Sequence, residues 1–394
     1  MSVEMGRIDS ADRIKRLPPY LFAEVDRLKR ELIQKGKDVI DLGVGDPDLP
    51  TPKFIIDALY EAAKDAKNHR YALDQGLPEL RKGMARWYQN RFGVELNPDT
   101  EILPLIGSKE GIAHLPLALL NPGDISLVPD PCYPVYKSAT WFAGGEVHLL
   151  DLLEENQYLP TFKDIPDRTL ERAKLLFLNY PNNPTGACAT PEFFKNTVSF
   201  AKEHQLIVCH DAAYTEIAFD HYKPLSFLQT PGAKSVGVEF HSLSKTYNMT
   251  GWRVGFVCGN HEVVRHLSKL KANIDSGIFQ AIQIAGLKAL EHGQAEVDRL
   301  KAIYQKRRDI VVNGFQEIGW QIQPPKATFY MWLPVPPGYT SQELCLKFLK
   351  EANVVVVPGN GFGSNGEGYF RISLTMAEDR LTEAVNRIKK IHTK

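Results

Sequence analysis

The sequence has no excess of charge of either sign. Its 394 residues include 47 lysines and arginines against 47 aspartates and glutamates. A protein that binds nucleic acid usually carries a clear basic surplus, because contacts to phosphates supply much of the affinity. The balance therefore argues against a nucleic-acid partner. With 43% hydrophobic and 24% charged residues, the composition is ordinary for a globular protein and excludes a disordered, collagen-like or coiled-coil chain.

Cysteine is scarce, and long apolar runs are missing. The five cysteines are widely spaced and form no C-x-x-C pair, so we predict neither a disulfide framework nor a metal site, and a reducing cytoplasm is the expected compartment. The longest apolar runs, such as 115–120 and 354–357, are far shorter than the ~20 residues of a membrane-spanning helix. Segment 1–20 lacks the apolar core of a signal peptide. We expect a soluble protein without a membrane partner.

Short apolar runs alternate with helical patterns along the chain. Strands that are buried on both faces of a parallel sheet have nearly continuous apolar sequences. Such runs occupy residues 102–106, 125–128, 174–178, 206–209, 236–240 and 254–258. The alternation predicts an α/β fold with a mostly parallel central sheet.

The C-terminal part has a different pattern. A long helical stretch follows residue 263, and then strands and helices are mixed. Further strands are predicted at 39–42, 330–333, 354–357 and 369–374, and further helices at 341–351 and 376–391. We expect the first segment to pack with the C-terminal part. The predicted division is an N-terminal arm with part of a small domain (1–45), a large domain (46–280), and an interdomain helix with the rest of the small domain (281–394).

The most informative segment is 241–246 (HSLSKT), which follows a predicted strand. Lys245 lies among hydroxyl side chains, and Arg253 follows eight residues later. Such a lysine can form a Schiff base with an aldehyde cofactor, while the hydroxyls and the arginine can bind a dianionic phosphate. The alternative is a surface lysine in a loop. Ser242 and Lys245 also fit the S-x-x-K motif of penicillin-recognising enzymes, but the S-D-N and K-T-G motifs that this interpretation requires are absent.

Two polar residues follow other predicted strands. Asp211 comes after strand 206–209, and ligands of open α/β sheets bind beyond the carboxyl ends of strands. A carboxylate there could pair with a protonated pyridine nitrogen, although acidic residues commonly end strands. Asn183 lies in segment 179–186 (NYPNNPTG), which is first of all a rigid turn. Its side chain could donate a hydrogen bond to a phenolic ring oxygen.

Two more strand ends offer binding groups. Segment 106–109 (IGSK) leaves a strand and opens a helix, so that free amides at the helix start, together with Ser108 and Lys109, form a natural phosphate site. Tyr133 places an aromatic ring after another strand.

The glycine-rich segment 361–366 matches G-x-G-x-x-G. A dinucleotide fingerprint must open a helix, whereas the next segment predicts a strand, so we interpret the glycines as a turn and expect no NAD. Arg371 lies in that strand among apolar neighbours. Because a buried unpaired arginine is costly, it should meet an anion. The anion is either a substrate carboxylate or a structural partner.

In their order and spacing these motifs resemble those of the class I and II aminotransferases, which are pyridoxal-phosphate enzymes of fold type I. The resemblance runs from about residue 20 to the C-terminus. It implies a large domain whose mostly parallel sheet lies between helices, and a smaller α+β domain built from both chain ends. It also implies pyridoxal 5′-phosphate as the cofactor, amino and 2-oxo acids as substrates, and a homodimer with shared active sites.

The resemblance also implies residue roles. Lys245 would be the catalytic residue, binding the cofactor covalently and shuttling protons, and Asp211 would keep the pyridine nitrogen protonated. Tyr133 would stack on the ring, while Asn183 and Tyr214 would hydrogen-bond the phenolic oxygen, which keeps the imine pKa low. The phosphate ligands would be Ser108, Lys109, Ser242, Ser244, Arg253 and, from the other subunit, Tyr71. The substrate would contact Arg371 through its α-carboxylate, and also Gly45, Tyr71, Lys109, Tyr133 and Asn183.

Within the family the sequence most resembles the LL-diaminopimelate aminotransferases. Tyr20, in segment 19–23 (PYLFA), matches a tyrosine that contacts substrate, and Asp74 stands where that group tends to have an acidic residue. The resemblance implies LL-diaminopimelate and 2-oxoglutarate as substrates in lysine biosynthesis. Asp74 could pair with the distal ammonium of diaminopimelate, or it could be a solvated turn residue. Ser276 stands where the group usually has asparagine, so aspartate, alanine or an aromatic amino acid remains an alternative donor.

Overall fold

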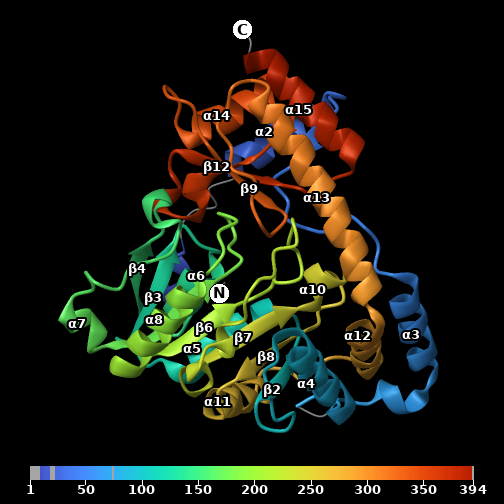
Figure 1. The fold of residues 1–394 in the computed structure, drawn as a ribbon, viewed down its shortest axis with the longest axis vertical. Coiled ribbons are helices and arrows are strands. Elements are labelled where there is room, and N and C mark those ends of the chain that lie inside the picture. Colours follow the sequence, from blue (N-terminus) through green and yellow to red (C-terminus); the bar gives the residue numbers. More distant parts are fainter. Residues whose placement is uncertain (1–8, 18–22, 73–74, 393–394) are drawn as a thin grey trace, which may run out of the picture.

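A seven-stranded sheet organises the larger part of the fold (Figure 1). The structure is a computed structural model that describes residues 9–17, 23–72 and 75–392. The strand order is β2-β8-β7-β6-β5-β3-β4. All pairings from β7 to β4 are parallel, whereas β8 is antiparallel to both neighbours. The strands are β2 (Ile102–Leu105), β3 (Ile125–Asp130), β4 (Glu146–Asp151), β5 (Ala173–Asn179), β6 (Ile207–Asp211), β7 (Gly237–Ser242) and β8 (Gly255–Gly259).

Helices cover both faces of this sheet, which confirms the predicted α/β class. Along β5, Leu175 and Phe177 contact the core under α5, α6 and α11, while Leu176 and Leu178 contact the core under α4, α8 and α12. A strand with apolar contacts on both sides has no polar alternation, which is why apolar runs located the inner strands. The covering helices are α3 (Lys53–Lys64), α4 (Pro78–Phe92), α5 (Ser108–Leu119), α6 (Val135–Phe142), α8 (Pro191–Glu203), α11 (His261–Lys271) and α12 (Gln280–His292).

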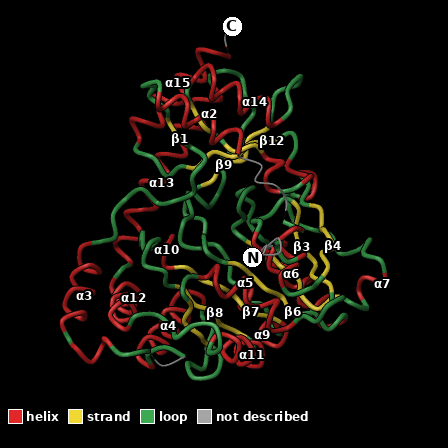
Figure 2. The backbone as a smooth tube through the Cα atoms, turned by 180° about the vertical axis from the view of Figure 1, so that it is seen from behind, coloured by secondary structure: helices red, strands yellow, loops and turns green. Residues whose placement is uncertain are grey.

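A second group of elements lies above the large sheet, and Figure 2 shows both groups from behind. It contains the antiparallel sheet β11-β12-β9 and the parallel pair β1-β10. Because β1 pairs with β10, the segment after α2 joins the C-terminal part. The elements are α2 (Ala23–Gln34), β1 (Ile40–Asp41), β9 (Tyr330–Pro334), α14 (Ser341–Lys347), β10 (Val354–Val355), β11 (Val357–Pro358), β12 (Tyr369–Ser373) and α15 (Glu378–His392).

The long helix α13 (Gln294–Gln316) connects the two groups, running from α12 to the sheet around β9 (Figure 1). Buried side chains such as Val311 and Phe315 join α13 to a separate core that also contains Phe370 and Val385. The large sheet and the second group therefore have distinct hydrophobic cores. No helix in the described ranges has both the length and the apolar character needed to cross a bilayer.

The structure differs from the predicted elements in three places. The edge strand β4 was not predicted, because only Leu150 in it is buried and its sequence is not a continuous apolar run. The predicted strand 354–357 is two strands, since Val355 pairs with β1 whereas Val357 pairs with Arg371 in another sheet. The predicted helix 341–351 is α14 followed by a π-helical segment, Phe348–Ala352.

Candidate active site

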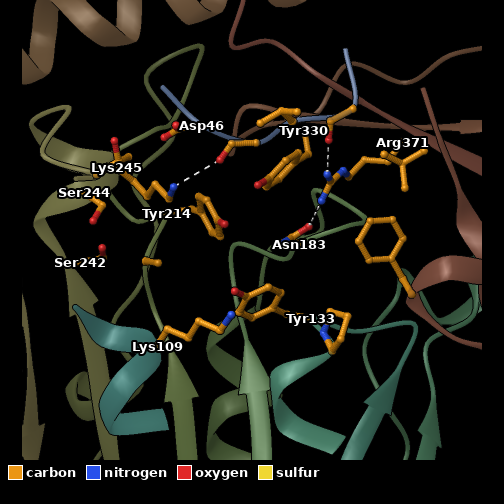
Figure 3. A pocket seen from close by; sticks show the side chains of 18 of the residues that line it. Asp46, Lys109, Tyr133, Asn183, Tyr214, Ser242, Ser244, Lys245, Tyr330 and Arg371 are labelled. Carbon is orange, nitrogen blue, oxygen red and sulfur yellow. Dashed lines mark hydrogen bonds between the residues drawn. The ribbon is translucent and has the colours of Figure 1, made fainter. Parts of the chain in front are cut away.

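A cavity of about 770 Å³ lies where the parallel strands end beneath the second group of elements. Figure 3 shows Lys245 and Arg371 on opposite sides of it, with Tyr214 and Asn183 between them. Most of the predicted site residues line this cavity. They are Gly45, Ser108, Lys109, Tyr133, Asn183, Asp211, Tyr214, Ser242, Ser244, Lys245, Arg253 and Arg371. The packing of strands thus brings together residues that are up to 326 positions apart in sequence, from Gly45 to Arg371.

Lys245 lies in the single helical turn α10 (Leu243–Thr246), directly after β7. Its Nζ donates a hydrogen bond to the Gly45 carbonyl at 3.3 Å. The pKa of Lys245 is lowered to about 8, mainly by burial, while the carboxylate of Asp46 opposes the shift and two nearby arginines add to it. A buried amine that is partly neutral near physiological pH can serve as a nucleophile and as a base. A solvated loop lysine would not have this environment.

Asp211 is the last residue of β6, and its carboxylate is only half satisfied. Oδ2 accepts a hydrogen bond from the Tyr136 hydroxyl at 2.8 Å. The other oxygen, Oδ1, is buried and has no hydrogen-bond partner among the described residues. Burial raises the pKa of Asp211, and the Tyr136 hydroxyl opposes that rise. An unsatisfied buried acceptor is costly, so Oδ1 is suited to a cationic N–H donor.

A second set of polar groups surrounds the start of α5, which begins at Ser108. Gly107 precedes it with φ +76°, and a Cβ there would overlap the Arg253 guanidinium. The positive φ favours glycine, and the absence of a side chain leaves room for the guanidinium. Arg253 donates to the Thr250 carbonyl at 2.9 Å. No carboxylate forms an ion pair with it in the ranges that the structure covers. Free amides at a helix start, an arginine and the hydroxyls of Ser242 and Ser244 suit a dianionic phosphate.

Arg371 is 7% exposed and has only neutral acceptors. Its Nη1 donates to Asn183 Oδ1 at 2.9 Å and its Nη2 to the Gly43 carbonyl at 2.8 Å. The guanidinium carbon lies 4.1 Å from the ring centre of Tyr330, and Nε is buried without a partner in the described part of the chain. Burial lowers the arginine's pKa. No described carboxylate makes an ion pair with Arg371, which favours a ligand carboxylate over a structural one as its anion.

Aromatic side chains form much of the remaining wall. Tyr214 makes edge contacts with Phe329 and Tyr330, at 5.5 and 5.6 Å between ring centres. Tyr133 lies near Lys109, whose Nζ is 5.8 Å from the ring centre. Burial raises the pKa of Tyr214 and of Tyr133, so both hydroxyls remain protonated donors near neutral pH.

Several residues at or next to the cavity are missing from the sequence predictions. Tyr330 and Phe362 line the cavity, and the Tyr136 hydroxyl donates a hydrogen bond to the Asp211 carboxylate. Tyr330 lies in the apolar run 329–333, which is the pattern of an ordinary core strand. Phe362 lies in the glycine-rich segment and Tyr136 stands next to a lysine, and neither setting indicates a site residue. Asp46 also lines the cavity. Nothing in the sequence indicates that its charge acts on Lys245.

Among the predicted residues that the structure describes, Tyr71 does not line this cavity. Tyr71 is 86% exposed and lines a separate cavity of about 580 Å³ together with Ser276 and Phe279. Tyr20 and Asp74 lie outside the described residues. Among the described residues there is no group of three or more histidine, cysteine, aspartate or glutamate side chains arranged to bind a metal ion.

Comparisons with known proteins agree with this geometry. Residues 37–388 match the family described as aminotransferase class I and II. The LL-diaminopimelate aminotransferase of Syntrophobacter fumaroxidans is 56% identical over 381 residues, covering 97% of this chain and 98% of that protein. The enzyme of the same name from Maridesulfovibrio salexigens is 56% identical over 388 residues, covering 98% and 100%. The apo structure of BacF from Bacillus subtilis is 42% identical with a TM-score of 0.93, covering 98% and 99%. This chain therefore belongs to the class I and II aminotransferase family.

Proposed function

We propose that this aminotransferase uses pyridoxal 5′-phosphate to transfer an amino group from LL-2,6-diaminopimelate to 2-oxoglutarate. The products would be tetrahydrodipicolinate, formed after cyclisation, and L-glutamate, and the step would belong to lysine biosynthesis. The name of the two relatives at 56% identity supports the choice of donor. The observation that carries the proposal is the joint presence, around one cavity, of a buried lysine, a half-satisfied aspartate and an arginine without a carboxylate partner among the described residues.

The residues present fit the proposed cofactor. Asp211 Oδ1 is a buried acceptor that a protonated pyridine nitrogen would satisfy. The start of α5 with Arg253, Ser242 and Ser244 would bind the phosphate, and Tyr133 would lie against the ring. When bound, the cofactor would withdraw electrons from the substrate Cα.

The substrate would be oriented by two groups of this chain. Arg371 would bind the α-carboxylate through two parallel hydrogen bonds, a geometry that only a guanidinium offers. Lys245 Nζ would then take the proton from Cα and return it later, and its lowered pKa suits proton transfer near neutral pH. Tyr214 and Asn183 would donate hydrogen bonds to the phenolic oxygen of the cofactor.

A homodimer with shared sites is part of the proposal. Tyr71 is 86% exposed although it is aromatic, and Phe279, which lines the same cavity, is also exposed. An exposed apolar surface of this kind suits a protein interface. Tyr71 would then reach the phosphate in the other subunit, and Asp74 would supply a carboxylate for the distal ammonium of the substrate, with Tyr20 as a further contact. The proposed compartment is the cytoplasm.

A substrate screen with 2-oxoglutarate as the acceptor tests this function. We expect LL-diaminopimelate to give glutamate with a kcat/KM at least about tenfold above that of aspartate, alanine or phenylalanine, because only the diamino acid uses a distal carboxylate partner. Lys245→Ala should lack the visible absorbance of lysine-bound cofactor, while Lys269→Ala, an exposed lysine on α11, should keep it. If aspartate, alanine or an aromatic amino acid is preferred instead, the alternative donor is correct.

A further inference from the structure

Asp130, at the end of β3, is fully buried and is not among the residues that contact the cavity. Its carboxylate accepts three hydrogen bonds. Oδ1 accepts from Lys137 Nζ at 2.6 Å, and Oδ2 accepts from Ser364 Oγ at 2.8 Å and from the Asn365 amide at 3.0 Å. Two of these donors belong to the glycine-rich turn between β11 and β12, in the second group of elements. Asp130 therefore joins the two groups at the edge of the cavity.

The glycine-rich turn approaches Asp130 closely through its backbone. It consists of the short 3-10 segments Gly359–Phe362 and Ser364–Gly366. Gly363 between them has φ +146°, and a Cβ there would overlap the Asp130 carboxylate. Only glycine fits this position, because the conformation and the contact both exclude a side chain. The G-x-G-x-x-G segment, whose pattern resembles a nucleotide-binding motif, thus allows close contact between the large sheet and the second group of elements.

The same turn carries Phe362 into the cavity wall. The Phe362 carbonyl accepts from the Cys132 amide at 2.9 Å, which fixes the turn beside the residue that precedes Tyr133. The ring centre of Phe362 lies 4.6 Å from the Arg371 guanidinium carbon, and the ring centre of Tyr330 lies 4.1 Å from it. The guanidinium is therefore held between two aromatic rings, and one of these rings depends on the turn.

We propose that Asp130 is a positioning residue for the substrate carboxylate: it fixes the glycine-rich turn so that Phe362 holds the Arg371 guanidinium in its carboxylate-binding orientation. The inference rests on the proposed function only in that Arg371 binds the α-carboxylate. Asp130 acts at a distance from the reacting atoms. A small displacement of a bidentate group weakens substrate binding strongly, because both hydrogen bonds must align at once.

Asp130→Asn tests the proposal, because it keeps the shape of the side chain but removes the charge that Lys137 neutralises. The measurements are kcat and KM for whichever amino acid the wild-type enzyme transaminates best, so a wrong choice of donor does not affect the result. We expect KM for the amino acid to rise about tenfold or more, since charge-assisted hydrogen bonds are lost, with kcat changed less. Asp99→Asn, which removes the charge of a mostly exposed partner of Arg81, is the matched control and should leave both constants unchanged.

Two further measurements distinguish a specific loss of carboxylate binding from a general loss of folding or cofactor binding. An amine without an α-carboxylate should react with the enzyme-bound cofactor equally fast in the wild type and in Asp130→Asn, and the absorbance of the bound cofactor should be unchanged. Ser364→Ala, which removes one hydrogen bond, should raise KM about fivefold and remains informative if Asp130→Asn does not fold.

A double-mutant cycle with Phe362→Ala completes the test. If Asp130 acts through Phe362, the double variant should have a KM similar to that of Phe362→Ala alone. Additive losses, an equal loss with the carboxylate-free amine, or an unchanged KM in Asp130→Asn and Ser364→Ala would each overturn the proposal.

Discussion

The guanidinium of Arg371 donates a hydrogen bond of 2.9 Å to the side-chain oxygen of Asn183. The arginine lies on β12 in the second group of elements, and the asparagine follows β5 in the large sheet. The bond therefore crosses between the two groups. Because Asn183 would also contact the cofactor, it would link the position of the substrate carboxylate to that of the cofactor ring.

Replacing Arg371 tests its role as the carboxylate ligand. Arg371→Lys keeps a positive charge but cannot form two parallel hydrogen bonds, so we expect KM for amino acid donors to rise about 100-fold. An amine without an α-carboxylate should be affected little. Arg380→Lys, at an arginine paired with Asp38 away from the cavity, should behave as wild type. A similar loss for both kinds of substrate would contradict the assignment.

The lowered pKa of Lys245 predicts how the apoprotein captures its cofactor. Only the neutral amine attacks an aldehyde, so the rate of cofactor attachment should increase with pH and be half-maximal near pH 8, where burial places the pKa of Lys245. Asp46→Asn should shift the midpoint to lower pH, because the Asp46 carboxylate raises this pKa. Stopped-flow absorbance over a pH series measures both effects. A midpoint near the ordinary value of 10.5 would mean that the amine is solvated.

Tyr136 should control the ionisation of Asp211. Burial raises the pKa of Asp211 and the Tyr136 hydroxyl opposes that rise, so Tyr136→Phe should raise the pKa further. The carboxylate would then be protonated over a wider pH range, and the acidic limb of the kcat/KM profile should move to higher pH, with a loss of about tenfold below it. Tyr304→Phe is the matched control, because the buried Tyr304 hydroxyl has no hydrogen-bond partner in the described ranges. An unshifted profile would contradict this role for Tyr136.

Shared active sites can be tested by complementation. Lys245→Ala and Tyr71→Ala would each inactivate or weaken both sites of a homodimer. In a mixed dimer, one site would combine the intact Lys245 of one subunit with the intact Tyr71 of the other. After equal amounts of the two variants are unfolded and refolded together, activity should recover to about a quarter of the wild-type value. Activity no greater than the sum of the separate variants would argue against a site that includes Tyr71 from the partner.

The sequence by itself determined the central architecture and most of the candidate site. The inner strands are buried on both faces, so their apolar runs are visible without any structure. The carboxyl ends of parallel strands meet at one edge of a sheet. Polar residues that follow those strands, such as Asp211, Asn183 and Lys245, could therefore be expected to converge on one cavity, and they do.

Only the tertiary structure decided how those residues are held. Nothing in the sequence around Tyr136 or Phe362 indicates a functional role, because that role depends on contacts with Asp211 and Arg371 from other elements. Asp130 and Ser364 are 234 positions apart, and no local pattern encodes that pairing. Periodicity and turn chemistry act over a few neighbouring residues, whereas the orientation of a buried charge depends on whichever side chains packing places around it.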